Sequence, residues 1–175
     1  MRETVAAGLL LLLPLTTPHP AHATVADVYP DYPTLAKTEV EGQDYLRLQR
    51  VPKGAAVAHI AVHGGAIEPP TTQLADHAAG RTYAFYSFVG IKPDGNSRLH
   101  ITSTNFDEPR ALKLVGAVDY TVSWHAAAGS TVTTYVGGRD TKLAAEVAAS
   151  LREAGFAVAE TVPDRINGTS PRNLG

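Results

Sequence analysis

Cysteine is absent from all 175 residues of the chain, and its absence limits both the stability and the chemistry of the protein. Without thiols the protein can form no disulfide bond, no thiolate bond to a metal and no cysteine nucleophile. Any transition-metal site must therefore be built from histidine, aspartate and glutamate side chains.

An excess of charge of one sign is also lacking, because the formal net charge is only -2. The chain has no basic field that would attract nucleic acid and no polybasic patch that would hold it on a membrane. With 44% hydrophobic and 18% charged residues, the composition is that of a soluble globular protein, and the length suits one domain. We expect a monomer without a nucleic-acid partner.

Long apolar runs are missing as well, apart from Val5 to Leu15 near the N-terminus. This run is shorter than the roughly 20 residues that a membrane-spanning helix needs. It follows Met1-Arg2 and precedes Ala21-His22-Ala23, a small-x-small pattern that precedes signal-peptide cleavage sites. We therefore predict a secretory signal peptide in residues 1–23, with a retained anchor or a buried helix as the alternatives. The secreted domain is then residues 24–175, with no membrane association after cleavage.

Predicted strands and helices alternate along the mature chain. This order indicates a single α/β domain with a mostly parallel or mixed central sheet flanked by helices. Apolar runs bounded by turn residues predict the strands, and an apolar stripe between Asp140 and Gly155 predicts the clearest helix. The predicted strands are 45–51, 55–62, 81–89, 99–104, 118–125, 131–136 and 156–162, and the predicted helices are 71–79, 109–115 and 141–154.

Two histidines fall at the carboxyl ends of predicted strands, where α/β sheets bind their ligands. His63 follows one apolar strand and His125 ends another, so we expect them to share a site. His100 lies beside a third predicted strand and could face the same cleft. His59 lies four residues before His63, and the pleat of a strand places both on one face. We interpret His59 as a core residue or a support for the site.

Glu68 is the natural companion of His63. The intervening Gly64-Gly65 lets the backbone turn sharply, so that the carboxylate can return toward the imidazole. Zinc hydrolases commonly use two histidines and one glutamate as ligands and leave one position for water, whose pKa falls from about 15.7 to about 7. On spacing alone, a glycine turn beside a surface glutamate explains the same residues.

Five blocks of the sequence resemble the poly-γ-glutamate hydrolase family. They occur in the family's order, extend across most of residues 45–173 and include several distinctive motifs. The blocks are Val62-His63-Gly64-Gly65-Ala66-Ile67-Glu68-Pro69, Tyr86-Ser87-Phe88-Val89-Gly90-Ile91-Lys92, Leu99-His100-Ile101-Thr102-Ser103-Thr104-Asn105-Phe106-Asp107-Glu108-Pro109, Tyr135-Val136-Gly137-Gly138-Arg139-Asp140 and Ile166-Asn167-Gly168-Thr169-Ser170-Pro171.

The resemblance implies a zinc-carboxypeptidase-like fold, a zinc ion and hydrolysis of γ-glutamyl amide bonds in poly-γ-glutamate. Carried over by position, the zinc ligands are His63, Glu68 and His125. His100 is the competing third ligand, and otherwise supports the site or faces the substrate. Arg139 lies in a family block and is the candidate for gripping a substrate carboxylate, since arginine can hold carboxylates with two hydrogen bonds.

The sequence departs from the family in two places. Ala126-Ala127-Ala128 follows His125, where the family usually has a glycine. The family's catalytic glutamate follows the block that ends at Pro171, and no counterpart occurs before Gly175. We therefore expect either a domain that is incomplete at its C-terminus or one without the usual general base, which is worth about 10²–10⁴-fold in rate. Asp107 and Glu108 are interpreted as caps of the next helix.

The leading hypothesis from the sequence is therefore a secreted, zinc-dependent hydrolase of poly-γ-glutamate. Two alternatives remain open. A cell-wall N-acetylmuramoyl-alanine amidase can also use two histidines and a glutamate around zinc. A non-catalytic domain that binds metal or polyglutamate would need no general base.

Overall fold

The computed structural model describes residues 27–174, so the predicted signal peptide and its cleavage site lie outside the described residues. Within the described part, no helix is both long enough and apolar enough to cross a membrane. The chain folds as a single α/β domain around one sheet, as the alternation of elements predicted.

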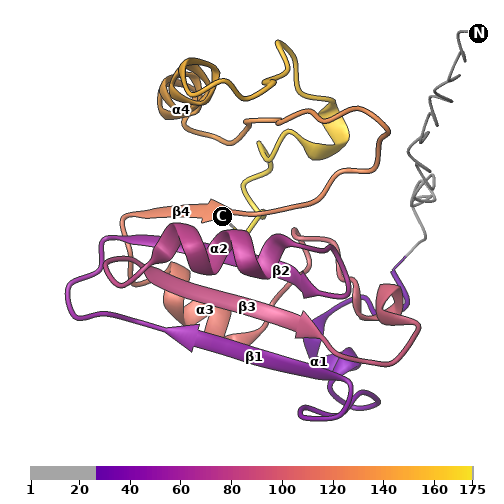
Figure 1. Ribbon diagram of the computed structural model, residues 1–175. Coiled ribbons are helices and arrows are strands. Elements are labelled where there is room, and N and C mark those ends of the chain that lie inside the picture. The colour runs from indigo at the N-terminus through magenta and orange to yellow at the C-terminus, as the bar shows by residue number, and fades with distance from the viewer. Residues whose placement is uncertain (1–26, 175) are drawn as a thin grey trace, which may run out of the picture.

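Four strands form a mixed sheet in the order β1-β3-β2-β4 (Figure 1). They are β1 (Tyr45–Arg50), β2 (Val57–Gly65), β3 (Ala84–Gly90) and β4 (Tyr120–Ser123). Strand β2 runs parallel to both β3 and β4, whereas β1 is antiparallel to β3. Because β2 and β4 are parallel, their carboxyl ends meet at the same edge of the sheet.

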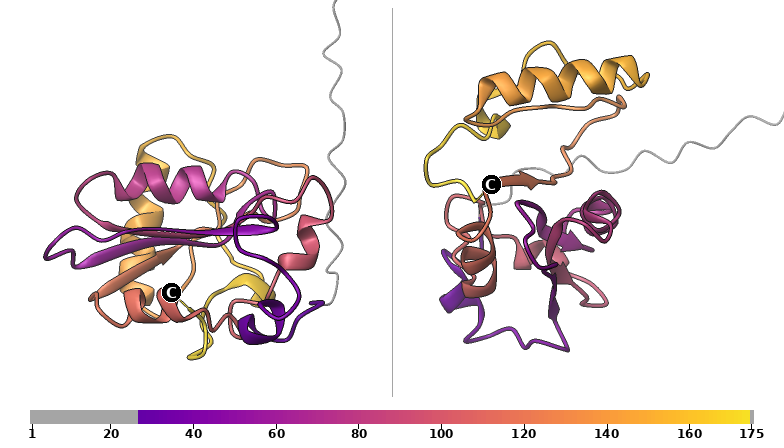
Figure 2. Two further views of the ribbon diagram at one scale, coloured as in Figure 1. Left: turned by 90° about the horizontal axis from the view of Figure 1, so that it is seen from below. Right: turned by 90° about the vertical axis from the view of Figure 1, so that its left-hand side faces the viewer.

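Helices cover both faces of the sheet (Figures 1 and 2). Helix α2 (Thr71–Ala79) packs on one face, over a small apolar cluster that includes Ala61 and Phe85. On the other face, α1 (Tyr32–Leu35) and α3 (Pro109–Val115) enclose the larger core. Alternate residues of the central strands point into this core, and its fully buried members are Leu35, Ala58, Ile60, Val62, Ala84, Tyr86, Phe88, Leu99, Ile101 and Ala111.

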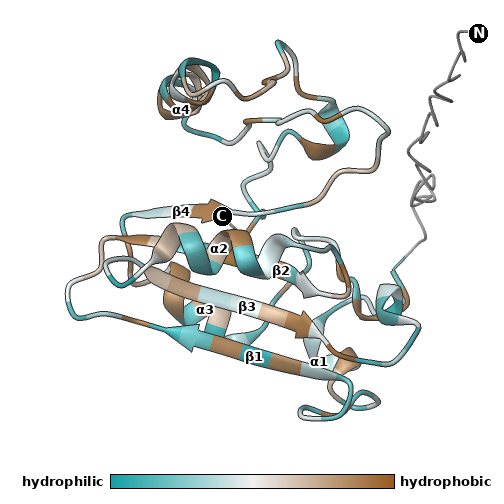
Figure 3. Ribbon diagram, in the orientation of Figure 1, coloured by the Kyte–Doolittle hydropathy of each residue, from teal (hydrophilic) through white to brown (hydrophobic). Residues whose placement is uncertain are grey.

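The segment after β4 is built differently. Residues 126–174 contain α4 (Thr141–Glu153) and the short 3-10 helix η2 (Asp164–Ile166). Helix α4 lies beyond β4, away from the other three strands (Figures 1 and 2), and the segment returns at its end so that Leu174 joins the larger core. Figure 3 shows apolar residues interspersed with polar ones along this layer. Among its described hydrophobic residues, only Ala148 and Leu174 are buried.

Three predicted strands are wrong. Within residues 99–104, Leu99 ends the 3-10 helix η1 (Asn96–Leu99) and the remaining residues are irregular. Side chains from other parts of the chain form hydrogen bonds with the backbone groups that a strand would use. Residues 131–136 and 156–162 meet only in the isolated bridge between Thr134 and Val158. A β-branched run forms a strand only where a neighbouring strand offers a full hydrogen-bonding edge, and this layer has none among the described residues.

Candidate metal centre

The segment from His63 to Glu68 leaves the carboxyl end of β2 and folds back on itself. The Glu68 N–H donates to the His63 carbonyl over 2.9 Å, and the Thr71 hydroxyl donates to the Glu68 carbonyl over 2.8 Å. Strand β2 continues two residues beyond His63, to Gly65. His63 is therefore the third-last residue of the strand and does not follow it. These bonds return the Glu68 carboxylate to the His63 ring.

Both glycines in this segment are required by the fold. A Cβ on Gly64 would lie 2.2 Å from the Ser87 Oγ and 2.9 Å from the Phe88 carbonyl oxygen, so only glycine lets β2 approach β3 this closely. Gly65 adopts φ +63°, in the left-handed region that favours glycine. The two glycines therefore have different roles: Gly64 allows the close approach of β2 to β3, and Gly65 makes the sharp turn with its positive φ.

Three side chains converge at this edge of the sheet. His63 Nδ1 lies 3.1 Å from Glu68 Oε1, and His125 Nδ1 lies 3.3 Å from Glu68 Oε2. The two Nδ1 atoms are 3.2 Å apart. His125 follows the end of β4 by two residues, so parallel strands deliver both imidazoles to the same place.

The other ring nitrogens are engaged by surrounding groups. His63 Nε2 donates to the Ile101 carbonyl over 2.8 Å, which fixes the ring and turns Nδ1 toward Glu68. His125 Nε2 lies 3.0 Å from the Ser123 Oγ. Partners of this kind on the far nitrogen orient a metal-binding histidine and raise its basicity. The His63 side chain is buried, whereas 36% of the His125 side-chain surface is accessible to solvent.

The Glu68 carboxylate is held in its ionised form. Burial alone would raise its pKa, but hydrogen bonds with His125 and His63 outweigh that effect, so the pKa lies well below its usual range. The Ala126 N–H adds a donor to Oε2 over 3.0 Å. A carboxylate that stays charged in a half-buried site offers a permanent negative ligand for a cation.

The donor set fits a zinc ion. Tetrahedral zinc with bonds of about 2.0–2.2 Å places neighbouring ligand atoms roughly 3.3–3.5 Å apart. The two Nδ1 atoms are 3.2 Å apart, and they lie 3.1 and 3.3 Å from different oxygens of the Glu68 carboxylate. Two imidazole nitrogens and one carboxylate are also the ligands of zinc sites that keep an open position for water.

His100 lies against this group and has its own anchor. Its ring stacks on the His63 ring with centroids 4.0 Å apart, and its Nε2 lies 3.8 Å from Glu68 Oε1. Its Nδ1 is 2.7 Å from Asp27 Oδ1. Donor atoms of His63, Glu68 and His100 also lie within 4.8 Å of one another, so His100 remains the competing third ligand.

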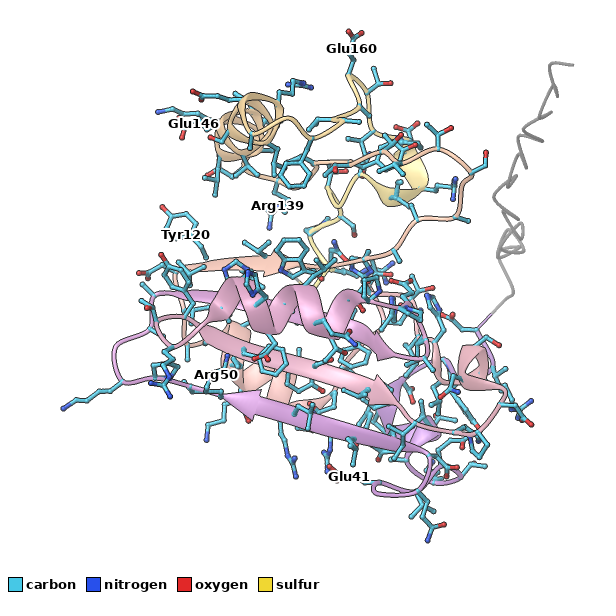
Figure 4. The ribbon with its side chains drawn as sticks, in the orientation of Figure 1. Glu41, Arg50, Tyr120, Arg139, Glu146 and Glu160 are labelled. Atoms are coloured by element: carbon cyan, nitrogen blue, oxygen red, sulfur yellow. The ribbon has the colours of Figure 1, made fainter. Side chains whose placement is uncertain are left out.

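The remaining sequence candidates lie apart from this group. His59 accepts a hydrogen bond from the Trp124 indole over 3.2 Å, and an irregularity in the pairing of β2 with β3 separates it from His63. Arg139 is exposed on the segment after β4 and points toward β4 (Figure 4), and within the described residues it makes no ion pair. Glu108 is fully buried and caps α3 through the Ala111 N–H, as predicted.

Two supporting residues had not been identified from the sequence. Asp27 accepts a hydrogen bond from the Thr102 N–H over 2.6 Å in addition to its contact with His100. Burial raises the Asp27 pKa, but these hydrogen bonds more than offset it and the pKa is lowered. Ser123 could have been suspected from its place two residues before His125, whereas Asp27 is 73 residues from His100 and no spacing links them.

Comparisons with known proteins place the chain beside one family. A family model described as poly-gamma-glutamate hydrolase matches residues 29–175. Among curated relatives, the UPF0714 protein YndL of Bacillus subtilis (strain 168) is 40% identical over 149 residues, which is 85% of this chain and 58% of YndL. The SPbeta prophage-derived UPF0714 protein YoqZ of the same organism is 37% identical over 157 residues, 89% of this chain and 56% of YoqZ.

Two solved structures share the fold. A bacteriophage poly-gamma-glutamate hydrolase superposes with a TM-score of 0.79 at 34% identity. The zinc-free, apo form of YndL superposes with the same TM-score of 0.79 at 40% identity. Each match covers 85% of this chain and 72% of the other. The chain therefore spans a little over half the length of its curated relatives.

Proposed function

The chain belongs to the poly-γ-glutamate hydrolase family, and we propose that His63, Glu68 and His125 form the zinc site of a hydrolase that cleaves γ-glutamyl amide bonds. The observation that carries the proposal is the convergence of two Nδ1 atoms and one carboxylate within 3.1–3.3 Å. The existence of a zinc-free form of YndL supports zinc as the family's metal.

Each ligand has a separate part in this proposal. Glu68 supplies a fixed negative charge, because its two histidine partners keep it ionised. His63 presents Nδ1 because its Nε2 proton is committed to the Ile101 carbonyl. His125 closes the site from the end of β4. Zinc held there would supply a Lewis acid for the amide carbonyl and would lower the pKa of water.

A proton acceptor is the part that the proposed mechanism still needs. Among the described residues, the carboxylates in contact with the site histidines are Glu68 and Asp27, and both are already committed to hydrogen bonds. Glu108 is enclosed by Arg47 and Tyr86 and does not reach the site. This observation favours a second candidate, a domain that binds zinc and polyglutamate without hydrolysing the polymer.

Zinc content tests the proposed site directly. We expect the purified protein to bind about one zinc ion per chain, measured by elemental analysis after exhaustive dialysis. His63→Ala should lose at least tenfold in affinity, because it removes one of three protein ligands. His77→Ala is the matched control, since His77 is exposed on α2 and should leave zinc binding unchanged. Wild-type protein without bound zinc would contradict the proposed site.

Substrate assays separate the candidate functions. Cleavage of poly-γ-glutamate, but not of peptidoglycan, supports the γ-glutamyl hydrolase, and the reverse result supports the amidase. Retention of poly-γ-glutamate without cleavage by zinc-loaded protein supports the binding domain. We propose export as well, because of the leader-like residues 1–23. The test is loss of those residues from protein recovered in the medium.

A further inference from the structure

The three-residue segment His100–Thr102 acts as a cradle for His63. Its first residue stacks on the His63 imidazole at 4.0 Å with the ring planes 25° apart. Its second residue, Ile101, accepts the His63 Nε2 proton through its carbonyl oxygen over 2.8 Å. A carbonyl oxygen can only accept, so this contact keeps a proton on Nε2 and leaves Nδ1 as the nitrogen that a metal can bind.

Within residues 27–174 the cradle pairs with no strand that would hold it in place. Instead, Asp27 holds both of its ends with a single carboxylate. Oδ1 lies 2.7 Å from His100 Nδ1, and Oδ2 accepts the Thr102 N–H over 2.6 Å. The Asp27 side chain is only 15% exposed, so solvent competes weakly for these bonds.

We propose that Asp27 is a positioning residue for metal binding. It fixes the His100–Thr102 cradle, and the cradle fixes the orientation and tautomer of His63. Asp27 contacts none of the three donor atoms directly, so it acts through the cradle alone. This inference rests on the zinc site proposed above.

Asp27→Asn is the first test. The amide keeps the size of the side chain but has only one acceptor oxygen, so it cannot accept from both the Thr102 N–H and His100 Nδ1 as the carboxylate does. Outer partners of metal-binding histidines are typically worth 10–100-fold in metal affinity. We expect the zinc Kd, measured by competition with a chromophoric chelator, to rise by about that factor.

A spectroscopic readout distinguishes positioning from a general loss of structure. Ring ¹⁵N shifts of metal-free protein report which nitrogen of His63 carries the proton. We expect a proton on His63 Nε2 throughout the wild-type population and on only part of the Asp27→Asn population. Asp31→Asn is the matched control, because it removes the same charge four residues later, at the cap of α1, and should change neither measurement.

His100→Phe provides a second, independent variant. Phenylalanine keeps a ring against His63 but can neither bind metal nor reach Asp27 with a hydrogen bond. We expect a loss of zinc affinity similar to that of Asp27→Asn, and a double variant no weaker than either single one. A much larger loss, equal to that of His125→Ala, would make His100 a ligand and overturn the positioning role.

Failure of this inference can be told apart from failure of the proposed function. If the wild-type protein binds no zinc, the proposed metal site is wrong. If the wild type binds zinc and Asp27→Asn keeps the same Kd and the same His63 tautomer, the metal site stands and only the role of Asp27 is overturned.

Discussion

Residues 45–125 supply most of the buried apolar core, whereas residues 126–174 leave most of their large apolar side chains in contact with solvent. In the sheet region every residue of β3 is buried. In the C-terminal layer the exposed fraction reaches 89% for Val132 and 57% for Phe156. Apolar residues of α4, which Figure 3 colours brown, are exposed as well, with 38% for Leu143 and 41% for Val147. We name these two parts the sheet region and the C-terminal layer.

This contrast indicates which residues of the candidate metal centre are held rigidly. His63 and Glu68 belong to the sheet region, and their local hydrogen bonds are backed by close packing of β2 on β3. His125 lies at the boundary, where the chain passes from β4 into the C-terminal layer. Its side chain is 36% exposed, compared with 3% for His63. Two donors are therefore preorganised, while the third depends on a less enclosed segment.

Aromatic truncation provides the strongest test of this contrast. Phe88 is fully buried and its ring lies 4.8 Å from that of Tyr45, so Phe88→Ala should lower the free energy of unfolding by about 3–5 kcal/mol. Phe156→Ala in the C-terminal layer should change it by no more than about 0.5 kcal/mol. Urea unfolding followed by circular dichroism measures both. Equal losses would mean that the C-terminal layer has a core of its own.

Removal of a buried charge should also lower the free energy of unfolding more in the sheet region than in the C-terminal layer, but by less than the aromatic truncation. Glu108 is fully buried and accepts hydrogen bonds from Arg47 and Tyr86, both over less than 3.0 Å, so Glu108→Gln leaves buried donors without their anion. We expect a loss of about 2 kcal/mol, below the 3–5 kcal/mol typical of broken buried pairs, because Arg47 keeps Glu41 as a partner.

The control for Glu108 is Glu146→Gln on the exposed face of α4 (Figure 4), which should shift the unfolding free energy by less than about 0.5 kcal/mol. Calorimetric or urea unfolding at neutral pH is sufficient for the pair. A loss at Glu146 as large as that at Glu108 would contradict the assignment of α4 to a solvent-exposed layer.

The same contrast explains which features the sequence could predict. His63 and His125 were found because each stands at the end of a strand, and parallel strands bring such ends together. The α2 and α4 helices were predicted almost to the residue, because their capping residues and apolar spacing are local signals. The donor geometry at Glu68 follows from the short loop after His63, which is also local.

Long-range contacts account for what the sequence did not reveal. Residues 99–104 resemble a strand, but Asp27 and His63 take the Thr102 N–H and the Ile101 carbonyl that a strand would use. Nothing in the spacing of Asp27 signals that contact. The β-branched run 131–136 has strand propensity without a full strand edge beside it, since propensity reflects the packed neighbours that a strand has.

The smallest expected difference concerns acid stability. A hydrogen bond from Arg47 is the main cause that holds the Glu41 pKa below its usual range, and Arg110 lies 3.5 Å from the same carboxylate. Because the folded pKa is depressed, the stabilisation is present above the unfolded pKa of about 4.3 and is lost as the pH falls through the folded value. The partly exposed carboxylate limits the effect to less than about 1 kcal/mol.

Glu41→Gln should therefore be less stable than the wild type at pH 7 and equal to it near pH 2, as measured by urea unfolding at both pH values. Glu160→Gln is the counterpart in the C-terminal layer, where Glu160 points into solvent (Figure 4) and forms no ion pair within the described residues. It should show no pH-dependent difference. If the Glu41 deficit persists unchanged at pH 2, the side chain stabilises the sheet region by packing rather than by its charge.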